Sequence, residues 1–315
     1  MAAVVGGHTL IPGVPMTTRH PVATNSAPPS TEFEPFAVRN APLEALVAGF
    51  SIEATPKQLE RVGALDLLLP AGTVVYVPFL PRAAMADTAD ACRRLTAQGL
   101  RPVPHLTTRS LTNRQKLIES LSRLADSGAE SLLLIAGDRR RAAGPFKSTL
   151  DVLDTGLLQE YGFRGIGVAG HPEGHTAADP EVLNDALRRK AAYARESESA
   201  MWIVTQFAFS GAPVISWLER VRDEGLDLPV RIGVPGPAKV QTLLRYAVQC
   251  GVAASSHMLA RRPGAVSRLL GRWTPDEMVA ELALRSVASP KLPIAGIHVF
   301  PFGGLLQSID YFTRQ

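Results

Sequence analysis

Residues 101–137 read RPVPHLTTRSLTNRQKLIESLSRLADSGAESLLLIAG, and this stretch decides the fold. It holds an apolar run, Pro102–Thr107, then a segment with apolar residues at helical spacing, Thr112–Ser127, then a second apolar run, Ser131–Ile135. The threonine that opens the middle segment is a suitable N-cap, and Gly128 ends the helical pattern. Both runs are apolar throughout instead of alternating, as in parallel strands covered on both faces. The stretch therefore predicts a strand–helix–strand unit with parallel strands.

The same rhythm of apolar run and amphipathic segment continues on both sides of this unit from about residue 45 onward. Gly99 follows the helical pattern of Pro81–Gln98, Asp179 stands before Pro180, and Thr274-Pro275-Asp276-Glu277 opens the last helix before the final run. These are usual stop and start signals of helices. Eight strands with intervening helices in about 260 residues predict a (β/α)₈ TIM barrel, an α/β fold. The eight predicted strands are Leu46–Ile52, Thr73–Pro78, Pro102–Thr107, Ser131–Ile135, Gly165–Ala169, Met201–Thr205, Val230–Val234 and Gly296–Phe300.

A doubly wound sheet is the competing α/β fold. It usually has a Gly-x-Gly-x-x-Gly turn after its first strand. Here the first apolar run is followed by Glu53-Ala54-Thr55-Pro56, which contains no glycine. The sequence therefore favours the barrel.

Composition limits the class of protein. The chain has 315 residues, of which 46% are hydrophobic, and only two cysteines. It is therefore neither disordered throughout nor a disulfide scaffold, and no stretch approaches the roughly 18 apolar residues of a membrane span. Residues 1–40, rich in Gly, Pro, Thr and Ser without an apolar period, predict an N-terminal extension, and residues 41–315 the catalytic barrel. Without a secretory signal pattern, we expect a cytoplasmic protein.

The charge pattern does not favour nucleic acid. There are 33 Lys and Arg against 29 Asp and Glu, and aromatic residues are 6% of the chain. Nucleic-acid binding usually requires a basic stripe interleaved with exposed aromatics. Scattered arginines suit an anionic small molecule better. The sequence leaves homo-oligomer formation open.

Polar residues follow several of the predicted strands, where barrel enzymes carry their chemistry. Glu53 comes directly after an apolar run, so that burial could raise its pKa and make it a general acid or base. The alternative is a structural carboxylate paired with a backbone amide or with Lys57. Gln206, followed by Phe207, suits recognition of an amide-like edge on a heteroaromatic ligand. The alternative for Gln206 is hydrogen bonding to neighbouring loops.

Two further strand ends carry candidate ligand contacts. Gly137 would let a ligand approach the backbone, and Asp138 could accept from a ring N–H or cap the following turn. His171 and His175 flank a Pro-Glu-Gly turn and suit hydrogen bonds to a phosphate or ribose, or only a structured turn. Because that turn lacks the helical spacing of a zinc protease, we expect no metal there. Neither a phosphate-binding P-loop nor a Gly-x-Ser-x-Gly nucleophile elbow is present in the sequence.

Six short motifs, in order along the chain, resemble those of the methylenetetrahydrofolate reductase family. The resemblance spans roughly residues 45–300. No single motif is specific, whereas six in this order on the predicted strands are. The six are Ser51-Ile52-Glu53, Pro104-His105-Leu106-Thr107, Gly137-Asp138, Ala169-Gly170-His171-Pro172-Glu173-Gly174-His175, Thr205-Gln206-Phe207-Ala208-Phe209 and Val234-Pro235-Gly236.

The resemblance implies an FAD-containing barrel in which NAD(P)H reduces the flavin, and the flavin reduces 5,10-methylenetetrahydrofolate to 5-methyltetrahydrofolate. It implies that Glu53 is the general acid that opens the methylene bridge and that Asp138 acts catalytically near flavin and pterin. Gln206 and Phe207 would join Glu53 in binding the folate substrate. The residues implied in cofactor binding are His105, Gly137, Asp138, His171, His175 and Lys190.

The sequence departs from the family pattern at several of these motifs. The family's arginine before Gly-Asp is Ala136 here, and the aromatic residue expected after Pro235-Gly236 is missing, with Leu243 nearest. Two alternatives therefore stay open. One is a folate enzyme of the same fold that works without flavin, and the other is a non-catalytic folate-binding barrel.

Overall fold

A computed structural model describes residues 46–80, 83–137, 139–175, 178–197, 199–250, 252, 272–302 and 304–314. All of them belong to one compact unit of the chain, Glu34–Gln315. The predicted N-terminal extension, residues 1–40, and the candidate residue Asp138 lie outside the described residues.

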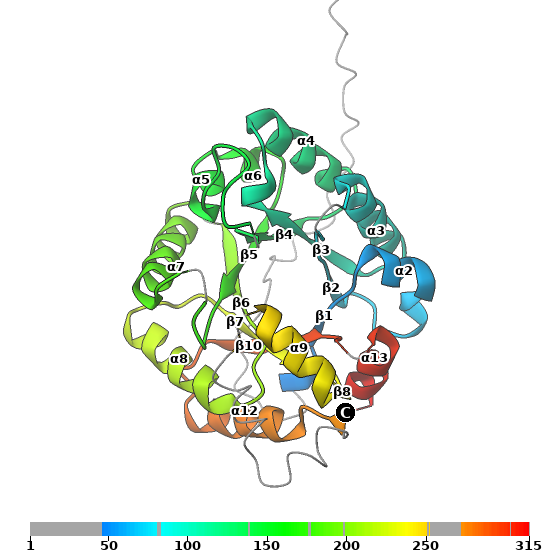
Figure 1. Ribbon diagram of the computed structural model, residues 1–315, viewed down its shortest axis with the longest axis vertical. Helices are drawn as coiled ribbons and strands as arrows, with labels where there is room; N and C mark the ends of the chain where they lie inside the picture. Colours follow the sequence, from blue (N-terminus) through cyan, green and yellow to red (C-terminus); the bar gives the residue numbers. More distant parts are fainter. Residues whose placement is uncertain are drawn as a thin grey trace, which may run out of the picture. The chain divides into compact units, whose positions relative to one another are not determined.

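Eight parallel strands close into a barrel in the order β1-β10-β7-β6-β5-β4-β3-β2 (Figure 1). The predicted TIM barrel is therefore confirmed. All neighbouring strands of the barrel are parallel. The barrel is closed by β1, which pairs with β10 on one side and with β2 on the other. The strands are β1 Ser51–Glu53, β2 Val74–Val77, β3 Arg101–Thr107, β4 Ser131–Ile135, β5 Gly165–Gly170, β6 Ala200–Thr205, β7 Val230–Pro235 and β10 Ile294–Phe300.

Helices surround the strands (Figure 1), and α12 packs against α8 on the outside of the barrel. Two short 3₁₀ helices, Leu65–Leu67 and Thr108–Ser110, and a two-stranded antiparallel sheet of β8 and β9 complete the elements. The α-helices are α2 Pro56–Val62, α3 Met85–Ala97, α4 Arg114–Ala125, α5 Thr149–Leu153, α6 Leu157–Glu160, α7 Pro180–Glu196, α8 Gly211–Asp223, α9 Val240–Cys250, α12 Asp276–Ala288 and α13 Leu305–Thr313. The short strands are β8 Ala238–Lys239 and β9 Arg272–Trp273.

Two element boundaries differ from the sequence prediction. The first strand begins at Ser51, because Leu46 and Val47 are helical and the Phe50 amide closes a turn onto Val47 O at 2.9 Å. The N-cap of α4 is Asn113 instead of the preceding threonine, since its side chain accepts from the Lys116 amide at 2.8 Å.

The strand pleat divides the core into two parts. Outward-facing strand residues pack under the surrounding helices, and inward-facing residues fill the barrel itself. The inner cluster is formed by Tyr76, Val103, Leu133, Trp202 and Val204, all of them buried. The interior of the barrel is therefore filled by side chains and leaves the mouth as the place where its strand ends can meet a ligand.

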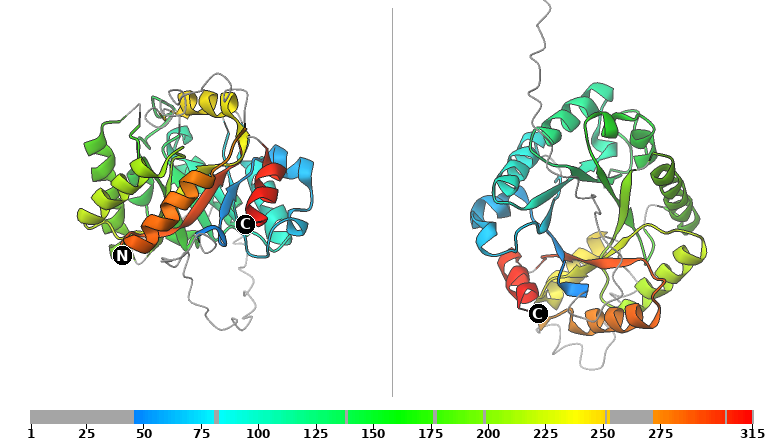
Figure 2. Two further views of the ribbon diagram at one scale, coloured as in Figure 1. Left: turned by 90° about the horizontal axis from the view of Figure 1, so that it is seen from below. Right: turned by 180° about the vertical axis from the view of Figure 1, so that it is seen from behind.

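Helix α9 lies at one end of the barrel instead of in the outer ring (Figures 1 and 2). Its buried residues Leu243 and Ala247 pack with Phe207 and Phe209, which follow β6. Phe300, at the end of β10, borders the same cluster. The strand ends of β6 and β10 are thus partly covered by α9, which places this helix beside the mouth.

Candidate active site

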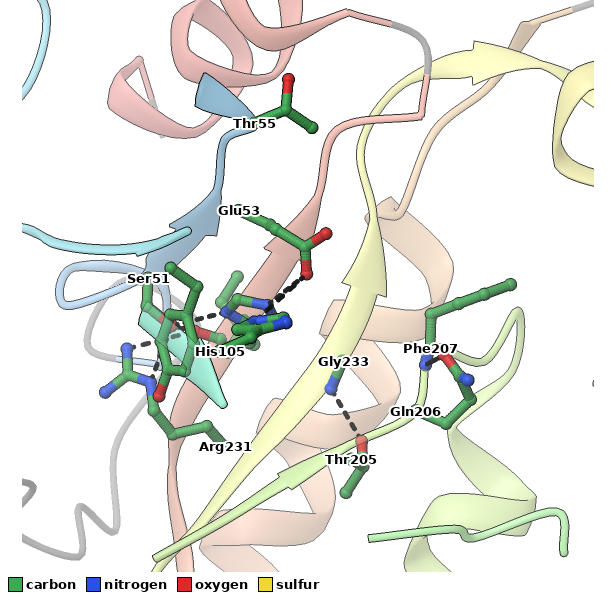
Figure 3. Close-up of polar contacts among 12 residues, drawn as sticks. Ser51, Glu53, Thr55, His105, Thr205, Gln206, Phe207, Arg231 and Gly233 are labelled. Carbon is green, nitrogen blue, oxygen red and sulfur yellow. Dashed lines mark hydrogen bonds and ion pairs between the residues drawn. The ribbon is translucent and has the colours of Figure 1, made fainter. Parts of the chain in front are cut away.

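Glu53 is the last residue of β1, at the mouth of the barrel (Figure 3). Its Oε2 lies 3.9 Å from Nε2 of His105 and 3.9 Å from Nε2 of His298. Its side chain is 23% exposed, which leaves it open to a ligand. Burial raises the pKa of the carboxyl above its ordinary 4.5, and His105 acts in the opposite direction. A carboxyl of this kind holds a proton at higher pH than a free glutamate does.

His105 lies on β3 and is buried, and its ring forms a T-shaped pair with Tyr76 at 6.2 Å between centroids. Burial lowers the pKa of this imidazole to about 4, so that it is neutral at pH 7. Its Nε2 has no hydrogen-bond partner among the described residues. The structure thus brings His105 and Glu53, two residues singled out from the sequence, into one group.

His298 lies on β10, is 1% exposed and completes this group from the other side. The Ser51 hydroxyl is 3.0 Å from its Nδ1, and the Arg231 Nε donates to the same hydroxyl at 3.1 Å. The Arg231 guanidinium also donates to the carbonyls of Ile297, at 3.1 Å, and Gly49. A buried arginine on β7 therefore anchors a chain of polar contacts that ends at Glu53.

Gln206 and Phe207 follow β6, close to one another in Figure 3. Gln206 stands two residues after Val204, whose side chain belongs to the inner cluster, and its Oε1 accepts from the Phe207 amide at 3.1 Å. The Phe207 ring is buried against other aromatic rings, with centroids 4.7 Å from Phe302 and 5.6 Å from Phe209. Within the described ranges no hydrogen bond or ion pair joins Glu53 to Gln206.

Gly137 follows β4 with a φ of +82°, a left-handed conformation that glycine adopts most easily. A Cβ at this position would lie 3.2 Å from Cβ of Thr107. The backbone conformation and the close neighbour both favour glycine here, independently of any ligand.

A second group of basic side chains lies at the end of β5 and on α7. The rings of His171 and His175 meet edge to face, with centroids 5.0 Å apart. Lys190 is buried, and within the described part of the chain no hydrogen bond or ion pair to its ammonium is found. Burial lowers the pKa of Lys190 to about 8, and burial with the charges of His175 and Lys190 lowers that of His171 to about 4. A buried cation beside imidazole N–H groups suits an anion.

No group of three or more His, Cys, Asp or Glu side chains could hold a metal ion in the part of the chain that the structure describes. No helix among those residues is long and apolar enough to cross a membrane.

Comparison with known proteins agrees with the geometry. The sequence model of methylenetetrahydrofolate reductase matches residues 73–266, which is more than half of the chain. The chain belongs to the methylenetetrahydrofolate reductase family. This confirms the resemblance on which the sequence analysis relied.

Among relatives in this family, methylenetetrahydrofolate reductase 2 of Saccharomyces cerevisiae is 27% identical over 173 residues, or 52% of this chain and 28% of that protein. Methylenetetrahydrofolate reductase 1 of Schizosaccharomyces pombe is 25% identical over 164 residues, or 49% of this chain and 26% of that protein. The matched region thus spans less than a third of either relative.

Among solved structures, an uncharacterized protein from Clostridium thermocellum shares the fold, with a TM-score of 0.55 and 11% identity. The match covers 86% of this chain and 99% of that protein, which binds two copies of 5-methyl-5,6,7,8-tetrahydrofolic acid.

The sequence analysis did not single out His298 or Arg231. It named Ser51 only as part of a motif, and not as a contact of His298. All three lie inside predicted strands. A charged residue within the apolar run Val230–Val234 is a usable signal, because a buried arginine needs hydrogen-bond acceptors close by. The serine and histidine carry no comparable signal, since their contact joins residues 247 positions apart.

Proposed function

We propose that this chain is an oxidoreductase of one-carbon metabolism that interconverts 5,10-methylenetetrahydrofolate and 5-methyltetrahydrofolate. Membership of the methylenetetrahydrofolate reductase family supports this proposal, as does the folate that the Clostridium thermocellum protein of the same fold binds. The observation that carries it is Glu53, a carboxyl with a raised pKa at the barrel mouth between two neutral imidazoles.

The role of Glu53 follows from the reaction. In the reductive direction, the bond between the methylene carbon and one bridge nitrogen must break before the carbon accepts a hydride. Glu53 donates a proton to the departing nitrogen, the other nitrogen forms an iminium with the carbon, and hydride addition gives the methyl group. In the oxidative direction Glu53 takes the proton back. Such general acid catalysis contributes about 10²- to 10⁴-fold.

The pterin ring of the folate would lie at the mouth, with Gln206 after β6, three strands away from β1. For Gln206 to bind a pterin edge, its amide must turn away from the Phe207 N–H that it now accepts. Phe207, buried in the aromatic cluster beside α9, would hold the segment after β6 that carries Gln206 in place.

The hydride donor is proposed to be NAD(P)H, with FAD as the carrier. The basic group of His171, His175 and Lys190 fits the phosphates of such a dinucleotide, because Lys190 is a buried cation and the imidazoles offer N–H donors. Gly137 and Asp138 are proposed as further cofactor contacts, as is His105. When bound, the flavin supplies hydride transfer between the nicotinamide and the folate.

A second candidate is a folate reductase that works without flavin, by direct hydride transfer from the nicotinamide. Two observations favour it. Ala136 stands where the family has an arginine, and His105, proposed for the flavin path, lies in the Glu53 group, where its ring forms a T-shaped pair with Tyr76.

The test uses the full chain, purified and assayed anaerobically with 5,10-methylenetetrahydrofolate and NADH or NADPH, with and without added FAD. We expect 5-methyltetrahydrofolate by mass spectrometry, and flavin absorbance that bleaches when the nicotinamide is added. Turnover by colourless protein, unchanged by FAD, selects the flavin-independent candidate. Folate binding without turnover under any of these conditions contradicts both and leaves a binding protein.

Glu53→Gln should lower turnover by about 10²- to 10⁴-fold while folate affinity changes little. The matched control is Glu119→Gln on α4, whose carboxylate pairs with Lys116 at the surface. If Glu53→Gln retains the turnover of the control, Glu53 is not the acid.

A further inference from the structure

His298 is surrounded by residues from four strands. Ser51 and Glu53 approach it from β1, Tyr76 from β2 with ring centroids 4.5 Å apart, His105 from β3, and Arg231 from β7. At 1% exposure it is too buried to meet a substrate directly. Its nearest contact at the open side of the group is Glu53, whose Oε2 its Nε2 faces at 3.9 Å.

The hydrogen bonds around Ser51 favour one ring nitrogen of His298 as the carrier of its proton. Arg231 Nε can only donate, so Ser51 Oγ accepts from it. The serine hydrogen then has two acceptors in reach, His298 Nδ1 at 3.0 Å and Ile297 O at 3.5 Å, of which the ring nitrogen is much the closer. The shorter distance favours Nδ1 as the acceptor, and in a neutral ring the proton then lies on Nε2, which faces Glu53.

The ring also stays neutral. Burial and the charge of Arg231 lower the pKa of His298 to about 3. An imidazolium at this place would hold Glu53 as a carboxylate and lower its pKa. A neutral ring offers only an N–H dipole, so Glu53 can keep its proton.

We propose that His298, held as its Nε2–H tautomer by Ser51 and Arg231, is the positioning residue of Glu53. The 3.9 Å between Nε2 and Oε2 exceeds a hydrogen bond by about 1 Å, and such contacts commonly tighten only when substrate binds. With Oε2 fixed as an acceptor, the other carboxyl oxygen carries the acid proton. Figure 3 shows that oxygen turned away from the imidazoles.

The tautomer can be tested on the wild-type protein without any assay of activity. Histidine ¹⁵N–¹H correlation spectra distinguish protonated from unprotonated ring nitrogens. For His298, assigned from the spectrum of His298→Gln, we expect a protonated Nε2 and an unprotonated Nδ1. A proton on Nδ1 overturns the proposal.

The kinetic test rests on the proposed function and uses Ser51→Ala, which removes the donor to Nδ1. We expect kcat for the folate reaction to fall roughly 10- to 100-fold, as for a misplaced catalytic group, with KM within about threefold. Without the Ser51 hydroxyl, the Nε2–H of His298 is no longer held toward Glu53. The pKa of Glu53 should therefore rise, and the pH at which activity declines should move upward. Ser120→Ala, which removes a buried hydroxyl that donates to Lys116 O on α4, is the control.

Variants of His298 separate a positioning role from a merely structural one. His298→Gln can place an amide N–H near the position of Nε2 and should retain more activity than His298→Ala, at equal folate affinity. If Glu53→Gln loses turnover while Ser51→Ala and both His298 variants match Ser120→Ala, only this inference fails. If Glu53→Gln itself matches its control, the proposed function fails first.

Discussion

The indole Nε1 of Trp202 donates a hydrogen bond of 2.8 Å to the hydroxyl of Tyr76, joining β6 to β2 through the interior of the barrel. Both side chains are buried. Burial raises the pKa of Tyr76 to about 12, so the phenol is neutral and accepts from the indole. Since the Tyr76 ring also meets His298 edge to face, the pair supports the imidazoles beside Glu53.

Removing this hydrogen bond should destabilise the barrel. Tyr76→Phe takes away the acceptor of a buried N–H, and Trp202→Phe takes away the donor and leaves a gap. We expect each to lower the free energy of unfolding by about 1–3 kcal/mol. In urea denaturation, the double variant should lose less than the two single losses together. Strictly additive losses would show that the two side chains contribute independently.

Gly233 on β7 should not tolerate a side chain. A Cβ there would lie 2.4 Å from Thr205 O and 2.8 Å from Cε2 of Phe300. Gly233→Ala must therefore push apart β6 and β10 beside Gln206, and we expect a loss of about 1–3 kcal/mol together with weaker folate binding.

The control for this variant is Gly49→Ala, because nothing lies within 4 Å of a Cβ at Gly49. Urea denaturation and folate titration of both variants give the comparison. Equal stability of the two proteins would mean that the strands move apart without resistance.

The barrel could be predicted because its strands are buried on both faces, which makes them continuous apolar runs in the sequence. Strand ends are equally visible, so Glu53 and Gln206 could be singled out as the first polar residues after such runs. The predicted first strand begins too early, because Leu46 and Val47 are as apolar as the strand that follows. Their helical turn leaves no mark in the hydrophobic pattern.

The partners of Glu53 could not be predicted in the same way. His298 and Arg231 stand inside apolar runs, and their roles depend on which strands become neighbours when the barrel closes. The sequence also does not indicate that α9 lies at the end of the barrel. Its apolar residues would fit a helix of the outer ring as well as one beside the mouth. Long-range pairing therefore determines this part of the site.

Acid should destabilise the protein below about pH 6.5. Burial lowers the pKa of His105 and His171 to about 4 and that of His298 to about 3, so the unfolded chain takes up protons that the folded chain refuses. Glu53, with a raised pKa, acts in the opposite direction and offsets part of this loss. The free energy of unfolding should fall by roughly 3 kcal/mol per pH unit between pH 6 and 4.5.

Urea denaturation at several pH values checks this slope. His171→Asn should reduce this slope by about 1.4 kcal/mol per pH unit, the share of one proton, because it removes the half-buried imidazole of His171. The same slope in this variant and the wild type would mean that His171 is solvated in the folded chain.

Lys190→Met should make the protein more stable and its dinucleotide affinity weaker. The buried ammonium has a pKa lowered to about 8 by burial, so folding disfavours its charge at pH 7. A methionine of similar length removes that penalty, and we expect a gain of about 1–3 kcal/mol. Because the unfolded lysine still binds its proton above pH 8, wild-type stability should rise with pH there, and the gain should shrink between pH 8 and 10.

The same substitution removes the cation proposed to meet the phosphates. We expect the Kd for NADPH or FAD, measured by calorimetry, to rise at least about tenfold, as for the loss of a charge-assisted hydrogen bond. The control is Lys116→Met, which removes a lysine that pairs with Glu119 on the surface. It should change neither the free energy of unfolding nor the free energy of dinucleotide binding by more than about 0.5 kcal/mol. A less stable Lys190→Met protein with unchanged Kd would mean that the lysine supports α7 and binds no phosphate.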